Sequence, residues 1–270
     1  MPTASGSFEL ALLPATTADT DYAATLAQQL GLPALAVGID PVHCSTADAL
    51  LIVEDGGLRL QQTGRAAPGP VVVDFGSAGM RHRRYAGARE ILGRAVGLGK
   101  KSALRVLDAT AGLGTDAFVL ADMGCEVLLC EREPVIAQLL HSGLLAAAGS
   151  SDPWLAGVVA RMQLCPGDAR AVSQHHLQQG VDVIYLDPMF PPRRKSAAVK
   201  KAMALFQSLL QGSSAPADAE ALLQWALLQD AARVVVKRPA RAPALAAQSP
   251  SHTISGKSVR YDVYVQRGLA

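Results

Sequence analysis

The residues best suited to chemistry begin with a glycine turn at positions 105–116, which read RVLDATAGLGTD. The pattern predicts a buried strand, a tight turn and the first turn of a helix. Gly112 and Gly114 lack a Cβ, so the backbone can adopt positive φ and a ligand can approach closely. Thr115 and Asp116 open the helix, whose free N–H groups point back at the turn. The stretch therefore predicts a site for a nucleoside-bearing cofactor.

Two classes of cofactor fit this turn. Residues 112–117, GLGTDA, match the dinucleotide pattern G-x-G-x-x-A. Asp108 and Asp116 bracket the turn, however, and carboxylates favour a cationic ligand such as S-adenosylmethionine (SAM) over a pyrophosphate. Glu131, at the end of the next predicted strand, can accept ribose hydroxyls in either class. A plain strand–helix turn with a capping Asp is the third interpretation.

Alternating strands and helices must position this turn. Strands are expected at 105–110, 125–131, 162–168, 181–187 and 232–238, and helices at 115–122, 134–148, 170–179, 196–210 and 217–230. This alternation predicts a Rossmann-like α/β fold with a mostly parallel, doubly wound sheet. Two closing strands at 251–255 and 260–266 suggest, by analogy, the C-terminal antiparallel hairpin of class I SAM-dependent methyltransferases.

Ligands bind such sheets at the carboxyl ends of the parallel strands. Four successive predicted strands end in an acid or an acidic turn, at Asp108, Glu131, Asp168 and Asp187. Packing does not account for this recurrence, since half-buried carboxylates cost free energy unless they are paired.

A second motif follows the fourth strand, at residues 183–192, VIYLDPMFPP. Asp187 offers an acceptor oxygen at the strand tip, and Pro188 fixes the backbone without contributing an N–H. Phe190 can lie flat against a ring. Together they can hold an exocyclic amino group of a base by two hydrogen bonds and one stacking contact. Methyl transfer to that amine then requires placement near the SAM sulfonium, without a strong general base.

The 270 residues allow one large domain and a small appendage. We expect a small N-terminal α/β subdomain at 1–66, with a hairpin around residues 54–57, EDGG. A basic connector at 67–104 and a methyltransferase domain at 105–270 follow. The connector includes a short strand at 71–75 and a flexible turn that leads into a basic cluster.

Net charge is only +2, but more than half of the 25 Lys and Arg fall within residues 81–101, 193–201 and 237–241. Clustered cations are typical of polyanion binding, although solvated surface charge would look the same. Residues expected to contact RNA are Arg81, Arg83, Arg84, Arg193, Arg194, Lys195, Lys200 and Lys201. Tyr85 could stack on a base.

Cellular location can be inferred from the cysteines and from the N-terminus. The four Cys lack C-x-x-C spacing and are expected to be reduced, without a metal. No signal peptide or membrane-spanning run is apparent. A cytoplasmic protein is the expectation.

The tetrad DPMF at 187–190 is similar to the Asn/Asp-Pro-Pro-Phe/Tyr motif of amino-group methyltransferases. Together with DATAGLG at 108–114, KSA and VKK within 195–201, VVVKRP at 234–239, RHRR at 81–84 and YDVY at 261–264, it resembles the ribosomal RNA small subunit methyltransferase J family. Within that family Met189 is the usual third residue of the tetrad.

The resemblance spans roughly residues 70–267 and implies SAM as cofactor and 16S rRNA, or the small ribosomal subunit, as partner. It implies methylation of the N2 amino group of guanine 1516. By position, Thr115 and Asp116 would contact SAM, Glu131 with Arg132 would hold its ribose, and Asp168 and Ala169 would flank its adenine. Asp187 would bridge cofactor and target amine. Two positions depart from the family pattern, since Thr115 replaces an Arg and Gly167-Asp168 replaces a small polar pair.

Three other functions compete with this interpretation. A DNA or RNA adenine-N6 methyltransferase would share the fold and a similar tetrad. A nicotinamide-dependent oxidoreductase would explain the glycine turn alone. A non-catalytic RNA-binding module would explain the cations alone.

Overall fold

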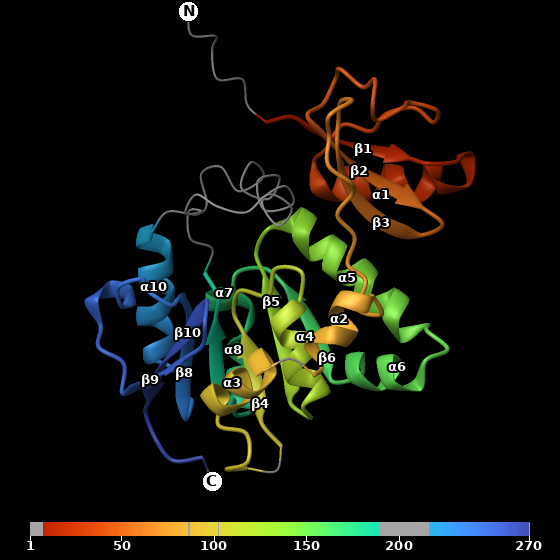
Figure 1. The fold of residues 1–270 in the computed structure, drawn as a ribbon. Helices are drawn as coiled ribbons and strands as arrows, with labels where there is room; N and C mark the ends of the chain where they lie inside the picture. Colours follow the sequence, from red (N-terminus) through yellow and green to blue (C-terminus); the bar gives the residue numbers. More distant parts are fainter. Residues whose placement is uncertain (1–7, 86, 102, 189–215, 270) are drawn as a thin grey trace, which may run out of the picture. The chain divides into compact units, whose positions relative to one another are not determined.

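The structure is a computed structural model that describes residues 8–85, 87–101, 103–188 and 216–269 (Figure 1). The chain divides into two compact units, with described residues 8–73 in the smaller and the remainder in the larger. Residues 74–101, which the sequence places in a connector, belong to the larger unit.

The smaller unit is a three-stranded sheet with one long helix. Strand β1 (Leu10–Pro14) pairs in parallel with β2 (Ala49–Glu54), which forms an antiparallel hairpin with β3 (Gly57–Gln62). The hairpin loop, Asp55-Gly56, has positive φ at both residues, as a type I′ turn requires. After the short helix η1 (Thr17–Asp19), α1 (Thr20–Leu30) ends at Gly31, which adopts the left-handed conformation. The strand expected at 71–75 is a single bridge between Val71 and Leu60.

The larger unit contains a seven-stranded sheet with the order β6-β5-β4-β7-β8-β10-β9. Five strands are parallel: β4 (Arg105–Asp108), β5 (Glu126–Glu131), β6 (Met162–Pro166), β7 (Val183–Leu186) and β8 (Arg233–Pro239). Strands β9 (His252–Ser255) and β10 (Val259–Val265) form the closing hairpin, and β10 lies antiparallel to β8. The expected doubly wound α/β fold with a C-terminal antiparallel hairpin is confirmed.

Helices α4 (Thr115–Asp122), α5 (Pro134–Ala148) and α10 (Pro216–Leu227) lie close to where the sequence predicts them. The helix expected at 170–179 is two short helices, α7 (Ala169–Val172) and α8 (Gln174–Gln178), and the one expected at 196–210 lies outside the described residues. Three further helices are α2 (Ala78–Arg83), α3 (Gly87–Val96) and α6 (Pro153–Val159). The flexible turn expected before the basic cluster is thus partly helical. The turn η2 (Leu245–Ala247) completes the unit.

The alternation of side chains along β7 and β8 separates two environments. Ile184, Val234 and Val236 join an apolar core with α10 and α7. Tyr185 and Lys237 occupy the alternate positions and point to the opposite face of the sheet. This second face receives the first turn of α4, because the Tyr185 hydroxyl donates a hydrogen bond to Asp116. No helix among the described residues is long and apolar enough to cross a membrane.

Candidate active site

The glycine turn of the larger unit leaves space for a ligand at one glycine and packs tightly at the other. Gly112 has φ +54°, and a Cβ there would meet nothing within 4 Å. Gly114 has φ +72°, and a Cβ there would lie 2.7 Å from Leu140 Cδ1 and 3.2 Å from Phe75 Cζ. Gly112 therefore faces the open side of the turn, whereas Gly114 lets the turn pack on the core. Thr115 is the first residue of α4.

The carboxylate of Glu131, at the end of β5, binds the backbone of the glycine turn. Its Oε2 accepts the Gly112 N–H at 2.8 Å and its Oε1 accepts the Glu133 N–H at 2.8 Å. Burial raises the pKa of Glu131, although these two bonds oppose the shift. Each oxygen retains a lone pair, so the carboxylate can still accept ribose hydroxyls.

Asp108, at the end of β4, is only 2% exposed and accepts the Thr110 N–H at 3.1 Å. Burial, and the nearby carboxylates Asp116, Asp187 and Glu131, raise the pKa of Asp108 to about 8. Each of the other three acids therefore lies close enough to Asp108 to affect its pKa. A cation bound beside Asp108 would favour its ionised form, as the cationic groups of SAM would.

Asp187 directly follows β7, and it is held by one contact of its backbone and one of its side chain. Its backbone N–H donates to Thr110 Oγ1 at 2.6 Å, and its Oδ2 accepts from Lys237 Nζ at 2.8 Å. The Asp187 side chain is 38% exposed, and among the described residues nothing donates to its Oδ1. Thr110 thus joins the glycine turn to the tip of β7, a role that the sequence analysis did not assign.

Asp116 does not cap α4 but points toward β7 and β8. Its Oδ2 accepts from Lys237 Nζ at 2.6 Å and from the Tyr185 hydroxyl at 2.7 Å. Burial raises the pKa of Asp116, but Lys237, the two hydrogen bonds and the charge of Arg83 outweigh burial and hold it below its ordinary value.

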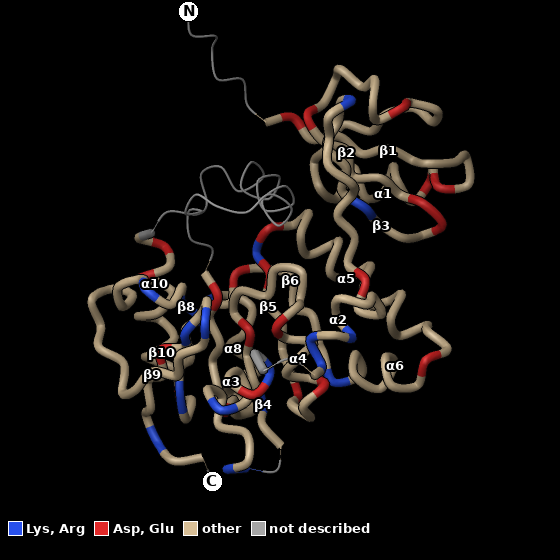
Figure 2. The backbone as a smooth tube through the Cα atoms, in the orientation of Figure 1, with Lys and Arg blue, Asp and Glu red and all other residues tan. Residues whose placement is uncertain are grey.

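Asp168, Ala169 and Arg132 lie at the ends of β5 and β6, beside Glu131. The Gly167 N–H donates to the Glu131 carbonyl oxygen at 2.8 Å. Asp168 caps α7 by accepting the Arg170 N–H at 2.9 Å, and it also pairs with the Arg170 guanidinium. Asp218 of α10 pairs with both Arg170 and Arg132. Asp168, which is expected to flank the adenine, and Arg132, which is expected beside the ribose, therefore belong to one charged network. Figure 2 shows acidic positions (red) around the labels β5 and β6.

The three arginines expected to contact RNA from the first basic cluster divide into two groups. Arg81 and Arg84 are separated by three positions and so share one face of α2, where their guanidinium carbons lie 5.1 and 4.7 Å from the Trp154 ring centre. Arg81 also pairs with Asp152 at 2.7 Å, and Arg84 with Asp122 at 3.5 Å. Arg83 is exposed, and its charge acts to lower the pKa values of Asp116 and Tyr261.

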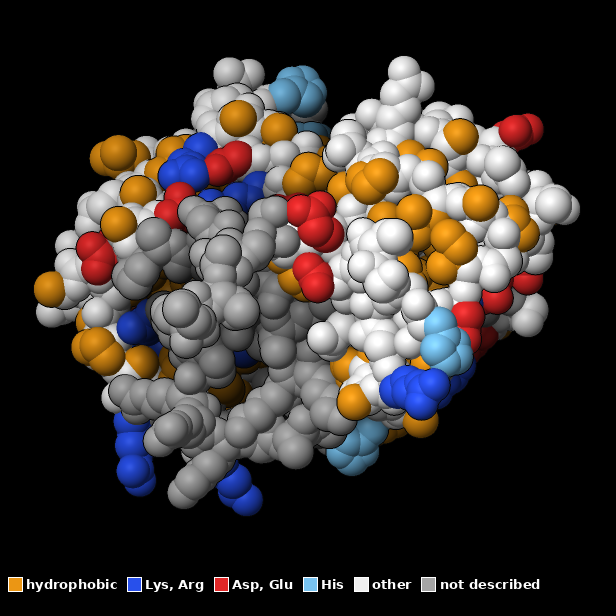
Figure 3. Space-filling model, turned by 90° about the horizontal axis from the view of Figure 1, so that it is seen from above, with side chains coloured by type: hydrophobic (Ala, Val, Ile, Leu, Met, Phe, Trp, Pro, Cys, Tyr) orange, Lys and Arg blue, Asp and Glu red, His pale blue; other side chains and the backbone are white. Residues whose placement is uncertain are grey.

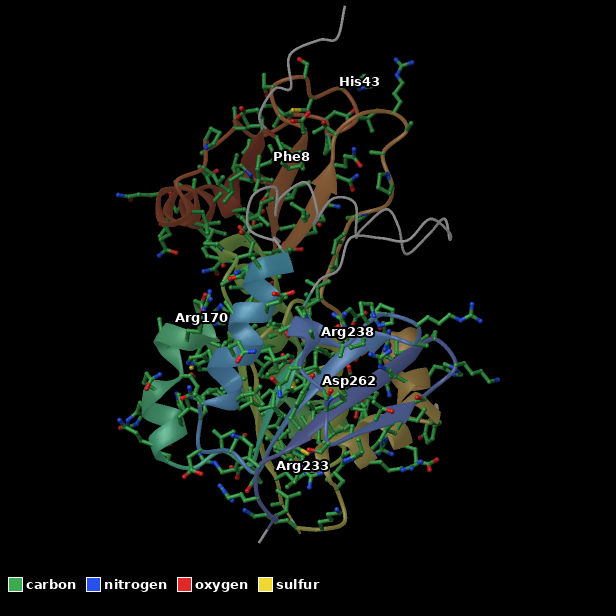
Figure 4. All side chains as sticks on the ribbon, turned by 90° about the vertical axis from the view of Figure 1, so that its left-hand side faces the viewer. Phe8, His43, Arg170, Arg233, Arg238 and Asp262 are labelled. Atoms are coloured by element: carbon green, nitrogen blue, oxygen red, sulfur yellow. The ribbon has the colours of Figure 1, made fainter. Side chains whose placement is uncertain are left out.

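The cations at 237–241 are largely engaged inside the protein. Lys237 holds two carboxylates, and Arg238 donates to the Pro243 carbonyl oxygen from Nε and Nη2. Figure 4 places Arg238 near Asp262 of β10, with Arg233 at the opposite end of β8. On the face in Figure 3, Lys and Arg of the described residues are scattered among acidic and uncharged side chains. The remaining cations on the RNA list, from Arg193 to Lys201, and the stacking residue Phe190 lie outside the described residues.

Comparison with known proteins relates the chain to SAM-dependent methyltransferases. A family model for SAM-dependent methyltransferases matches residues 35–266. The ribosomal RNA small subunit methyltransferase J of Pseudomonas fluorescens is 49% identical over 231 residues, which cover 85% of this chain and 87% of the relative. The protein of the same name from Marinobacter nauticus is 46% identical, with 96% and 92% covered.

A solved structure extends the agreement to the fold. The SAM-dependent methyltransferase from Neisseria gonorrhoeae superposes with a TM-score of 0.70 at 32% identity, covering 96% of this chain and 97% of that one. The cofactor is therefore SAM rather than the nicotinamide dinucleotide that the glycine pattern left open. The chain belongs to the ribosomal RNA small subunit methyltransferase J family.

Proposed function

We propose that the protein methylates the N2 amino group of guanine 1516 in 16S rRNA, with SAM as methyl donor. The observation that carries this proposal is the geometry of Asp187 at the tip of β7. There a half-exposed Asp187, held by Thr110 and Lys237, keeps Oδ1 available beside the open glycine turn.

Different residues of the chain would bind the cofactor and the substrate. Glu131 is placed to accept the ribose hydroxyls, and Asp108 to receive a cationic group next to Gly112. When bound, SAM supplies a methyl group activated by its sulfonium. Asp187 Oδ1 and the Asp187 carbonyl oxygen can accept the two N–H bonds of the guanine amine, which favours a pyramidal nitrogen with a free lone pair. Phe190 would stack on the guanine.

Correct placement supplies much of the acceleration, because holding amine and methyl group in line replaces an encounter of two molecules by one bound geometry. The proton leaves the methylated nitrogen for Asp187 Oδ1 and passes from there to water. No metal ion is required by this sequence of events.

We further propose that Arg83 contacts an RNA phosphate near the target base. Arg81 and Arg84 are bound to Trp154 and to acids, and so fix α2 to the methyltransferase unit. Tyr85 is 81% exposed, with the Arg84 guanidinium carbon 5.8 Å from its ring centre, and its ring would stack on a neighbouring base. Arg193, Arg194, Lys195, Lys200 and Lys201 would extend this contact along the backbone.

The decisive experiment is mass spectrometry of 16S rRNA fragments from a strain that lacks the gene. The fragment containing guanine 1516 should lack one methyl group, and a plasmid copy of the gene should restore it. Asp187→Ala should not restore the methyl group, whereas the matched control Asp230→Ala, at an acid that is exposed in the same unit, should. A methyl group lost from another base, or full restoration by Asp187→Ala, would contradict the proposal.

A further inference from the structure

Lys237 makes two charged contacts that link the cofactor turn to the tip of β7. Its Nζ lies 2.6 Å from Asp116 Oδ2 and 2.8 Å from Asp187 Oδ2. The two acids come from α4 and from the end of β7, while Lys237 comes from β8. A single ammonium therefore connects three elements of the larger unit.

Asp116 is itself fixed, because the fully buried Tyr185 donates to the same oxygen at 2.7 Å. Tyr185 and Lys237 project from neighbouring strands onto one face of the sheet, and the ring of Tyr261, which pairs with Lys237 in register, lies 6.4 Å from that of Tyr185. The Lys237 ammonium thus binds a carboxylate oxygen that a buried hydroxyl also binds.

The charged groups around Asp187 shift its pKa in opposite directions. Burial raises the pKa of Asp187 above its ordinary value, Lys237 opposes this rise without cancelling it, and the nearby Asp116 carboxylate adds to it. Asp108 also lies within range, since the Asp187 charge raises its pKa. The two carboxylates hold the pKa of Lys237 above its usual range, although burial opposes them, so the ammonium stays charged. Of these groups, only Lys237 favours an ionised Asp187.

We propose that Lys237 is a positioning residue for methyl transfer, which keeps the Asp187 carboxylate ionised, binds its Oδ2 and leaves its Oδ1 for the substrate amine. This inference rests on the proposed function. As the N2 lone pair forms the bond to the methyl carbon, the S–C bond breaks and its electron pair stays on sulfur. The N2 proton then moves to Asp187 Oδ1, which can receive it only if Asp187 is ionised.

A pH–rate profile separates this role from a structural one. Single-turnover methylation of 16S rRNA should fall at low pH as Asp187 becomes protonated. This fall in rate at low pH is the acid limb of the profile. In Lys237→Met the midpoint of the acid limb should move to a pH higher by about one unit or more, because an opposite charge beside Asp187 has been removed, and the rate should recover at alkaline pH. Lys237→Arg should keep a profile close to that of the unmodified protein. Lys257→Met, at an exposed lysine of the same unit, is the matched control.

Asp116→Asn provides the opposite perturbation. It removes a negative charge near Asp187 while leaving an amide oxygen for Tyr185, so the acid limb should move to lower pH. Shifts of opposite sign in the two variants would be difficult to obtain from a general loss of folding. An equal loss of rate at every pH in Lys237→Met, without a shift, would overturn the proposal.

A spectroscopic measurement tests the same inference without the RNA. The carboxyl ¹³C resonance of Asp187, assigned by its disappearance in Asp187→Asn, should titrate at a higher pH in Lys237→Met than in the unmodified protein. An unchanged titration would refute the role of Lys237. If 16S rRNA is the wrong substrate, the unmodified protein fails in the methylation assay while this titration still shifts, so the two failures can be told apart.

Discussion

Asp108 should stay protonated in the ligand-free protein at neutral pH, and Asp108→Asn should therefore stabilise it. The carboxyl is 2% exposed, and burial with three nearby acids raises its pKa from 3.8 to about 8. An Asn keeps the oxygen that accepts the Thr110 N–H but has no proton to bind.

The sign and size follow from proton linkage. The folded protein holds the Asp108 proton more tightly than the unfolded chain does. This contribution to stability is fully present below pH 3.8 and is lost as pH rises toward about 8. Each pH unit is worth about 1.4 kcal/mol for one proton. Between low pH and pH 7 the free energy of unfolding of the unmodified protein should fall by about 4 kcal/mol through Asp108. Asp108→Asn should not show this loss.

Urea unfolding at several pH values between 4 and 8, followed by tryptophan fluorescence, measures this difference. Both tryptophans, Trp154 and Trp225, lie in the larger unit, so the signal reports the unit that contains Asp108. The free energy of unfolding of the variant should exceed that of the unmodified protein by an amount that grows with pH. A difference that stays constant from pH 4 to pH 8 would refute the assignment of a raised pKa to Asp108.

Four further predictions concern the turn and the cationic residues. Gly114→Ala should lower the free energy of unfolding by about 1–3 kcal/mol, since its Cβ would overlap Leu140. Gly112→Ala should cost about 1–2 kcal/mol for its positive φ but should also remove the thermal shift caused by SAM, and a retained shift would place the cofactor elsewhere. Arg83→Ala should weaken RNA binding and reduce the salt dependence by roughly one phosphate contact, whereas Arg81→Ala, whose guanidinium pairs with Asp152, should leave that slope unchanged. Arg193→Ala combined with Lys195→Ala should likewise give a shallower salt slope, measured by filter binding between low and moderate salt, and an unchanged slope would exclude this segment from the interface.

The acids at the strand ends could be predicted from sequence because they follow directly from local patterns. An apolar run of strand length that ends in Asp or Glu places that acid at the carboxyl edge of a parallel sheet, whichever order the strands adopt. Asp108, Glu131 and Asp187 needed no further information. The glycine turn was equally accessible, since Gly112 and Gly114 mark positive φ within a strand–helix junction.

The Lys237 network could not be predicted in the same way. Lys237 is 121 positions from Asp116 and 50 from Asp187, so their contact depends on the strand order β4-β7-β8 and on which face of β8 the lysine occupies. A signal was present, because Lys237 directly follows the apolar run 234–236 in a predicted strand of the sheet, where a charged side chain requires a partner. The sequence analysis instead assigned it to a basic surface cluster.

The arginine cluster at 81–84 shows that composition alone does not predict which side chains share a surface. Four consecutive residues with three arginines suggest one basic surface, but a helix separates Arg83 from Arg81 and Arg84 by more than a quarter turn. The cue for that helix was Ser77, whose side chain accepts the Met80 N–H as an N-cap. In the same way, Asp152 followed by Pro153 marks the start of α6.

The four carboxylates at the site are compensated by four different means, and this difference explains what each can do. Glu131 is held by two backbone N–H groups, and Asp116 by Lys237 and Tyr185. Asp187 shares the Lys237 ammonium through one oxygen, and Asp108 is compensated by a proton. Asp108 is the one of the four whose compensation, a proton, is not a contact within the protein, so a bound cation could replace it. We therefore expect a cationic group of the cofactor next to the open side of Gly112, which would leave Asp187 Oδ1, to which no described residue donates, for the substrate.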